Sequence, residues 1–179
     1  MNIALYGGSF DPPHIGHVNV VTTALAVLDI GKLIVVPTFV NPFKLGTHAS
    51  AKQRLAWLQK VFEKEVHVEV SDFEVLQNRA VPSIDTVTHF AKVYARIYFI
   101  IGADNLASLR KWHRFKALDE RVTWVVATRH DIAIPKEYIQ LHVDHAISSS
   151  ELRVQLQDAQ LPPVVAASIK TYYEENHAR

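Results

Sequence analysis

The stretch Gly7-Gly8-Ser9-Phe10-Asp11-Pro12-Pro13-His14-Ile15-Gly16-His17 decides the fold, because it joins a short apolar run to a helical pattern. Ile3-Ala4-Leu5-Tyr6 comes before it and the apolar-rich residues 18–28 follow it, which predicts a strand, a glycine turn and a helix. Two glycines let the backbone pass close to a ligand, and the first amides of a helix favour an anion. His14 and His17 are three residues apart, so on a helix both imidazoles can address one phosphate. The stretch therefore predicts a site for a polyphosphate.

Composition sets outer bounds on the kind of protein. A chain of 179 residues with 49% apolar residues fits one globular domain, residues 1–179. The net charge of +1 gives no basic excess, so we expect no nucleic-acid partner. Cysteine is absent, which excludes disulfides and thiolate metal sites, and no apolar run is long enough to span a bilayer. We expect a cytoplasmic protein with no membrane partner.

Apolar runs alternate with helical patterns along the chain, which predicts parallel βαβ crossovers and a doubly wound sheet of about five strands. This is an α/β, Rossmann-like class with additional C-terminal helices. The expected strands are 3–6, 32–37, 67–70, 97–101 and 122–126. The expected helices between them are 16–28, 51–64, 83–95 and 105–118.

The last forty residues carry a different pattern. Ser148 with Glu151 three residues later is a capping-box pattern, so a helix should begin there and run to about residue 157. Leu161-Pro162-Pro163 interrupts it, and a final helix over 164–175 follows. We expect this pair of helices to pack across the binding edge of the sheet.

Ligands of open α/β sheets bind beyond the carboxyl ends of the strands, where the strand order reverses. Gly7–His17, which we call the histidine stretch, follows the first expected strand. Asn41–Lys44 follows the second, and Gly102-Ala103-Asp104 follows the fourth. These three segments are therefore expected to meet at one site.

The histidine stretch closely resembles the Gly-Gly-Ser-Phe-Asp-Pro-Pro-His-x-Gly-His motif of the bacterial nicotinate mononucleotide adenylyltransferases, within the wider nucleotidyltransferase superfamily. The resemblance covers nearly the whole chain, from Gly7 to Asn176. It implies adenylyl transfer from ATP to nicotinate mononucleotide. Nucleophile and leaving group are both anionic at neutral pH, so positioning and charge neutralisation carry such a reaction. Mg²⁺ would accompany the triphosphate, and no carboxylate cage for a resident metal is evident.

The resemblance assigns roles at the phosphates. His14 and His17 would meet the α-phosphate, Lys44 would bridge the incoming phosphate, and Arg153 would grip the β- and γ-phosphates. Arg153 lies in Ile-Ser-Ser-Ser-Glu-Leu-Arg, similar to the family's Ile-Ser-Ser-Thr-x-x-Arg, with Ser150 in the threonine position. The further ATP-binding residues implied are Gly7, Gly8, Ser9, Phe10, Gly102, Asp104, Ser148, Ser149 and Ser150, with Asp104 on the ribose.

The motifs for the acceptor nucleotide match less closely. Gly102-Ala103-Asp104 with Leu109-Arg110-Lys111-Trp112 resembles the family pattern in which the tryptophan stacks on the pyridine base. Asn41-Pro42-Phe43-Lys44 keeps the proline and lysine of Pro-Pro-His-Lys, and Pro82-Ser83 replaces Tyr-Thr. The implied acceptor residues are Ser9, Lys44, Ser83 and Trp112.

Plainer interpretations stay open for each motif. The histidines could form a metal pair or serve as helix caps, Asp104 and Ser83 could be N-caps, and Trp112 could be a core residue. Trp57 and Trp124 lie in apolar patterns and are expected in the core. Rival functions are a related adenylyltransferase with another phosphorylated acceptor, an inactive nucleotide sensor, and a metal hydrolase using His14, His17, His142 and His145. A homodimer is also left open.

Overall fold

The computed structural model describes residues 1–40, 48–143 and 147–177. Its centre is a parallel sheet of six strands in the order β3-β2-β1-β4-β5-β6, the order of a doubly wound fold. The predicted class is confirmed, but the prediction of five strands was wrong. The strands are β1 (Asn2–Gly8), β2 (Lys32–Pro37), β3 (Val68–Val70), β4 (Arg96–Gly102), β5 (Thr123–Ala127) and β6 (Ile139–Leu141).

The sixth strand was missed because it is only three residues long, although apolar and polar residues alternate over Ile139–Val143. β6 has three residues at the edge of the sheet, of which only Leu141 is buried. It pairs in parallel with β5, Val125 opposite Ile139.

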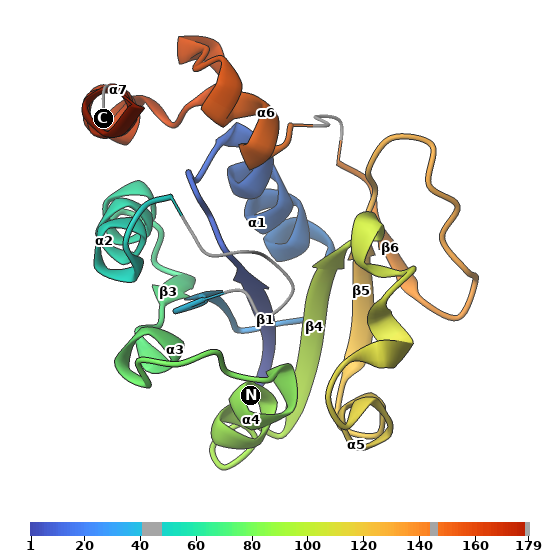
Figure 1. The fold of residues 1–179 in the computed structure, drawn as a ribbon. Coiled ribbons are helices and arrows are strands. Elements are labelled where there is room, and N and C mark those ends of the chain that lie inside the picture. The colour runs from blue at the N-terminus through green and yellow to red at the C-terminus, as the bar shows by residue number, and fades with distance from the viewer. Residues whose placement is uncertain (41–47, 144–146, 178–179) are drawn as a thin grey trace.

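Helices cover both faces of the sheet (Figure 1). Alternate residues of β1 point to opposite faces, so Ile3 and Leu5 pack with α4 and α5, whereas Ala4 and Tyr6 pack with α1 and α2. Burial on both faces explains the continuous apolar runs of the central strands. The helices are α1 (Ile15–Val27), α2 (Ala51–Val61), α3 (Phe73–Leu76), α4 (Ser83–Phe90), α5 (Phe115–Asp119), α6 (Ser149–Val154) and α7 (Pro163–His177).

The single helix expected over 105–118 is wrong. The segment forms two 3₁₀ turns, Ala103–Asn105 and Leu109–Lys111, and then α5. Its apolar residues recur every third position, which suits 3₁₀ turns better than the 3.6-residue period of an α-helix. These residues are Leu106, Leu109, Trp112, Phe115 and Leu118, and all pack into the cluster on the α4 and α5 face.

The C-terminal helices lie together at one end of the fold, near α1 and α2 (Figure 1). Ser148 is the N-cap of α6, as the capping-box pattern predicts, but the helix ends at Val154, so the predicted end near residue 157 was wrong. α7 packs against α2 through Trp57 and Tyr173. Both helices contact the Gly7–His17 stretch at the binding edge: α6 through Ser149 and Arg153, and α7 through Tyr173. Among the described residues, no helix is long and apolar enough to cross a membrane.

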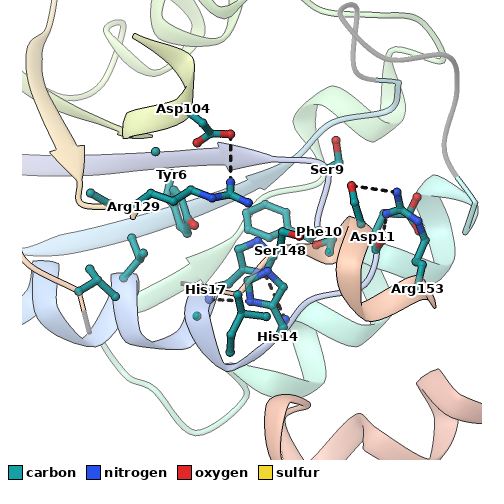
Figure 2. Close-up of a pocket in the computed structure, with 18 of the residues that line it drawn as sticks. Tyr6, Ser9, Phe10, Asp11, His14, His17, Asp104, Arg129, Ser148 and Arg153 are labelled. Atoms are coloured by element: carbon teal, nitrogen blue, oxygen red, sulfur yellow. Dashed lines mark hydrogen bonds and ion pairs between the residues drawn. The ribbon is translucent and has the colours of Figure 1, made fainter. Parts of the chain in front are cut away.

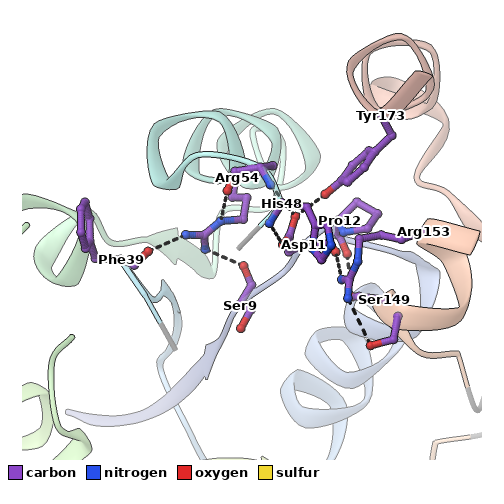
Figure 3. A network of polar contacts seen from close by, with 11 residues as sticks. Ser9, Asp11, Pro12, Phe39, His48, Arg54, Ser149, Arg153 and Tyr173 are labelled. Atoms are coloured by element: carbon purple, nitrogen blue, oxygen red, sulfur yellow. Dashed lines mark hydrogen bonds and ion pairs between the residues drawn. The ribbon is translucent and has the colours of Figure 1, made fainter. Parts of the chain in front are cut away.

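A buried guanidinium holds the loops at the carboxyl ends of β1 and β2 (Figure 3). Arg54 on α2 is fully buried and donates to three carbonyl oxygens: Ser9 at 2.6 Å, Phe39 at 2.8 Å and Ala49 at 3.1 Å. Ser9 belongs to the loop after β1 and Phe39 to the segment after β2. One side chain thus fixes both loops against α2.

Asp11 is the second anchor of the same network (Figure 3). Its carboxylate is 3% exposed and accepts from the backbone amides of His48 at 2.7 Å and Ala49 at 3.0 Å. The hydroxyl of Tyr173 on α7 also donates to it. Burial raises the pKa of Tyr173, so this hydroxyl keeps its proton and remains a donor. The histidine stretch is therefore held from α2 and from α7.

Replacing Arg54 should destabilise the fold strongly. Arg54→Met would remove the donor of one buried and two partly buried carbonyls, and we expect the free energy of unfolding to fall by about 3 kcal/mol or more. Urea denaturation followed by circular dichroism measures this. Lys52→Met, an exposed change on the same helix, is the control and should stay within about 0.5 kcal/mol of the parent protein. An Arg54→Met protein of parental stability would contradict the anchoring role.

Candidate active site

Two cavities open at the carboxyl ends of the strands and share one wall. We call them the histidine cavity, of 520 Å³ and lined by His14, His17 and Arg153, and the tryptophan cavity, of 560 Å³ and lined by Ser83 and Trp112. The shared wall lies between β1 and β4, where the strand order reverses. The residues that line both cavities are Tyr6, Ser9, Phe10, His17, Gly102, Asp104 and Arg129.

The two histidines form a reciprocal cap at the start of α1. His14 is the N-cap, and its Nδ1 accepts from the His17 amide at 3.3 Å, while Nδ1 of His17 accepts from the His14 amide at 3.1 Å. The rings stack with centroids 3.6 Å apart (Figure 2). An imidazole whose Nδ1 accepts carries its proton on Nε2 when neutral, so each ring keeps a donor at its far nitrogen. The capping interpretation is therefore correct, and the cap uses only the Nδ1 atom of each ring.

His14 is a neutral donor at physiological pH. Its ring is 4% exposed, and burial, aided by the positive charge of Arg129, lowers its pKa to about 3. A neutral imidazole can donate through Nε2 without bringing a charge into the cavity.

Gly8, within the Gly7–His17 stretch, leaves room for a neighbouring aromatic ring. Phe10 has a φ of 49°, in the left-handed region, and its ring lies under His17 with centroids 4.8 Å apart. A Cβ on Gly8 would come within 3.1 Å of this ring. Gly8 thus lets the Phe10 ring support His17. Gly7 and Gly8, which the resemblance assigns to ATP, line the tryptophan cavity.

Asp104 and Arg129 form an ion pair at the shared wall (Figure 2). Nη1 of Arg129 lies 3.0 Å from Oδ2 of Asp104. A Cβ on Gly102 would sit 2.6 Å from Oδ1 of Asp104, so the glycine makes room for this carboxylate. Gly102 precedes the 3₁₀ turn and Asp104 lies inside it without a capping bond, so the N-cap interpretation of Asp104 is wrong.

Side chains of α6 reach back to the histidine stretch. Oγ of Ser149 donates to the Pro12 carbonyl at 2.9 Å, and Nη1 of Arg153 donates to the Asp11 carbonyl at 2.5 Å. Oγ of Ser148 caps α6 by accepting from the Glu151 amide at 3.1 Å. These contacts place Ser148, Ser149, Ser150 and Arg153 on the wall of the histidine cavity.

Trp112 is both a packing residue and a cavity residue. Its half-buried ring meets Phe99 and Trp124 edge-on, with centroids 6.4 and 6.2 Å apart, and lines the tryptophan cavity. Trp57 and Trp124 are 2% and 6% exposed, which confirms them as core residues.

Ser83 is the first residue of α4 and Pro82 occupies the N-cap position, so the N-cap interpretation of Ser83 is wrong.

Every predicted site residue within the described ranges lines one of the two cavities. Lys44, with Asn41 and Phe43, lies outside those ranges, as does His145 of the hydrolase alternative. Across the described residues, no group of three or more His, Asp or Glu side chains could hold a metal ion.

Arg129 and Glu74 are the site residues that the sequence did not single out. Arg129 follows β5, so the strand-end rule that predicted Asp104 would have found it if applied to this strand as well. Glu74 lies on α3, a single turn that no sequence pattern predicted. Its place in the site follows from the fold, which brings α3 to the wall of the tryptophan cavity.

Comparison with known proteins agrees with this geometry. The cytidylyltransferase-like family model matches residues 5–155. The "Probable nicotinate-nucleotide adenylyltransferase" of Sulfurimonas denitrificans is 51% identical, over 99% of this chain and 97% of the relative. The protein of the same name from Campylobacter fetus is 46% identical over the full length of both chains.

Solved structures share the fold. A nicotinic acid mononucleotide adenylyltransferase of Plasmodium falciparum, complexed with NaAD, superposes with a TM-score of 0.79 at 21% identity over 97% of each chain. A putative nicotinate-nucleotide adenylyltransferase of Vibrio parahaemolyticus gives a TM-score of 0.71, over 94% of this chain and 98% of the other. Two adjoining cavities at the strand switch, a histidine pair at a helix start and these relatives agree: the chain belongs to the cytidylyltransferase-like family and, within it, to the nicotinate-nucleotide adenylyltransferases.

Proposed function

We propose that the chain joins ATP and nicotinate mononucleotide to give nicotinate adenine dinucleotide and pyrophosphate. A phosphate oxygen of the mononucleotide attacks the α-phosphorus of ATP in line. The bond from that phosphorus to the oxygen bridging to the β-phosphorus breaks, and pyrophosphate leaves with the electron pair. The attacking oxygen is already anionic, so the protein has to position and neutralise rather than supply a strong base.

The shared wall of the two cavities is the observation that carries this proposal. A transfer between two nucleotides needs two pockets that meet where the bond forms. His17, Asp104 and Arg129 line both cavities at that meeting point. One pocket would hold the donor triphosphate and the other the acceptor.

The histidine cavity suits the triphosphate. The Nε2–H groups of His14 and His17 would donate to the α-phosphate, and Arg153 with the α6 serines would meet the β- and γ-phosphates. Asp104 would accept from the ribose hydroxyls of the nucleotide. Arg129 lines both the histidine cavity and the tryptophan cavity. We therefore add it to the groups that neutralise the charge of the phosphate being transferred.

The tryptophan cavity suits the acceptor. The ring of Trp112 would stack on the pyridine base, while Ser83 and Ser9 would supply hydroxyls. Lys44 would bridge the incoming phosphate.

Mg²⁺ would be held by the triphosphate oxygens and water, as is usual for this ion in nucleotide sites. It would neutralise charge on the leaving pyrophosphate.

The reaction would run in the cytoplasm, where ATP is the common adenylyl donor. We also treat residues 1–179 as one nucleotidyltransferase domain, which the family match over 5–155 and the packing of α7 on α2 support.

Pyrophosphate release from ATP, Mg²⁺ and nicotinate mononucleotide tests the activity directly. Release together with the dinucleotide supports the proposal. Nucleotide binding without turnover would favour the sensor alternative, and turnover only with a different phosphorylated acceptor would change the substrate.

The first variant separates the two jobs of His17. His17→Asn keeps an oxygen where Nδ1 accepts from the His14 amide, but it loses the Nε2 donor. We expect kcat to fall about a hundredfold or more, because one preorganised donor contributes about 3 kcal/mol to transition-state stabilisation, with the melting temperature unchanged. His67→Asn, exposed and outside both cavities, is the control. Full activity in His17→Asn would remove His17 from the machinery.

The second variant tests Arg129. Its ion pair with Asp104 is partly solvent-exposed, so Arg129→Gln should change the free energy of unfolding by less than about 1 kcal/mol. The loss of a cation at the shared wall should still lower kcat by about a hundredfold. Arg121→Gln at the opposite end of β5 serves as the matched control. Parallel losses of stability and activity would instead mark Arg129 as structural.

The third prediction concerns the base of the acceptor. Backbone amides and hydroxyls donate well to an anionic carboxylate, whereas a carboxamide would turn an NH₂ toward these donors. We expect kcat/KM to favour nicotinate over nicotinamide mononucleotide by roughly ten- to a hundredfold, from an unpaired-group cost of about 1–3 kcal/mol. Steady-state kinetics with both acceptors decides it, and equal values would overturn the acid preference while leaving adenylyl transfer intact.

A further inference from the structure

Glu74 is a buried carboxyl group with one oxygen committed and one unsatisfied. It is 5% exposed, and its Oε1 accepts a hydrogen bond of 2.6 Å from the hydroxyl of Thr86. Its Oε2 is buried and, among the described residues, has no hydrogen-bond partner. Leaving such an atom unpaired is costly, so an unsatisfied buried oxygen at a cavity wall points to a ligand.

A second atom in the same cavity has the same property. Oγ1 of Thr38, just after β2, is buried and finds no partner within the described part of the chain. Thr38 and Glu74 come from different elements, yet both line the tryptophan cavity. The polar side of this cavity is thus incomplete without an occupant.

The protonation of Glu74 is set by burial. Burial raises its pKa to about 7, and the hydrogen bond from Thr86 opposes this rise only in part. The charged and titratable groups on the elements packed against it are Lys32 on β2, Lys52, Arg54 and Lys60 on α2, and Asp85 and His89 on α4. Across the cavity stand Asp104, Lys111, His113 and Arg129. None of these is a cause of the shift, so Glu74 is a neutral acid below pH 7 and loses its proton as the pH rises through 7.

We propose that Glu74 is a specificity-determining residue of the tryptophan cavity, whose Oε2 donates a hydrogen bond to a carboxylate on the base of the acceptor. The proposal deepens the proposed function and rests on it. With Oε1 occupied by Thr86, the proton of the neutral acid belongs on Oε2, where it needs an acceptor. A ring carboxylate supplies two strong acceptor oxygens.

Ionisation of Glu74 reverses this preference. A buried carboxylate would repel a carboxylate on the base, whereas it would accept a hydrogen bond from the NH₂ of a carboxamide. Glu74 binds its proton more firmly when the acid is bound, so binding nicotinate mononucleotide above pH 7 takes up a proton. The preference for the acid over the amide should therefore decline as the pH rises through 7.

The experiment is the ratio of kcat/KM for nicotinate over nicotinamide mononucleotide between pH 6 and 8.5. Both acceptors carry the same phosphate, so its titration and that of the ATP site cancel in the ratio. We expect the ratio to fall about tenfold or more across this range. Glu74→Gln keeps a donor and an acceptor at every pH, so its ratio should be flat. Asp72→Asn removes an exposed carboxylate two residues away and should keep the parental pH profile.

Calorimetry of binding gives a second readout that needs no variant. At pH 7.5, in buffers of different ionisation enthalpy, nicotinate mononucleotide should bind with uptake of a fraction of a proton beyond that of the amide. A pH-independent ratio in the parent protein, an unchanged decline in Glu74→Gln, or equal proton uptake for the two ligands would each overturn the role of Glu74. Absence of pyrophosphate release with either acceptor would instead overturn the proposed function itself.

Discussion

The guanidinium of Arg54 is the interaction on which the rest of the site depends. Strand ends in a parallel sheet are held by the ladder, but the loops beyond them are not, and their carbonyls need donors. Arg54 supplies three such donors from one rigid, planar group, to the carbonyls of Ser9, Phe39 and Ala49. A planar fork that satisfies three carbonyls in the loops after β1 and β2 fixes the relative positions of these loops as well as their hydrogen bonds. Lysine would present its three N–H donors from one nitrogen, whereas Arg54 uses three separate nitrogens in a fixed plane.

The loops that Arg54 fixes hold the hydrogen-bond donors of the site in place, which suits a reaction that depends on positioning and charge neutralisation. The Asp11 carboxylate holds the histidine stretch from its buried side, and the stacked rings then stand on the Phe10 ring. Beyond them the wall shared by the two cavities carries Arg129 and Asp104. Donors held so rigidly need little reorganisation when charge moves during a reaction, which is how a site without a strong base can still accelerate transfer between two anions.

Much of this could be predicted from sequence, and the failures have physical causes. Continuous apolar runs predicted the central strands because both of their faces are buried. β6 was missed because a three-residue strand gives too short an alternation to stand out from the loop around it. A run of Leu106, Leu109 and Trp112 was taken for an α-helix because three- and four-residue spacing look alike over short stretches. The histidines and Asp104 were found because they follow strands with clear patterns. Glu74 was not, because nothing in its local sequence tells that one of its oxygens is left over after α3 meets α4.

The reciprocal cap of His14 and His17 joins two properties that are separate in most helices. The same ring nitrogens that start α1 also dictate which nitrogens carry hydrogen on the other edge of each ring. A proton added at Nδ1 of His14 in strong acid would therefore fray the first turn of α1 and charge the histidine cavity in one event. The first turn of α1 and the protonation state of the histidine cavity are therefore coupled. A spectroscopic signal from the His14 imidazole would report on the helix start as well as on the site.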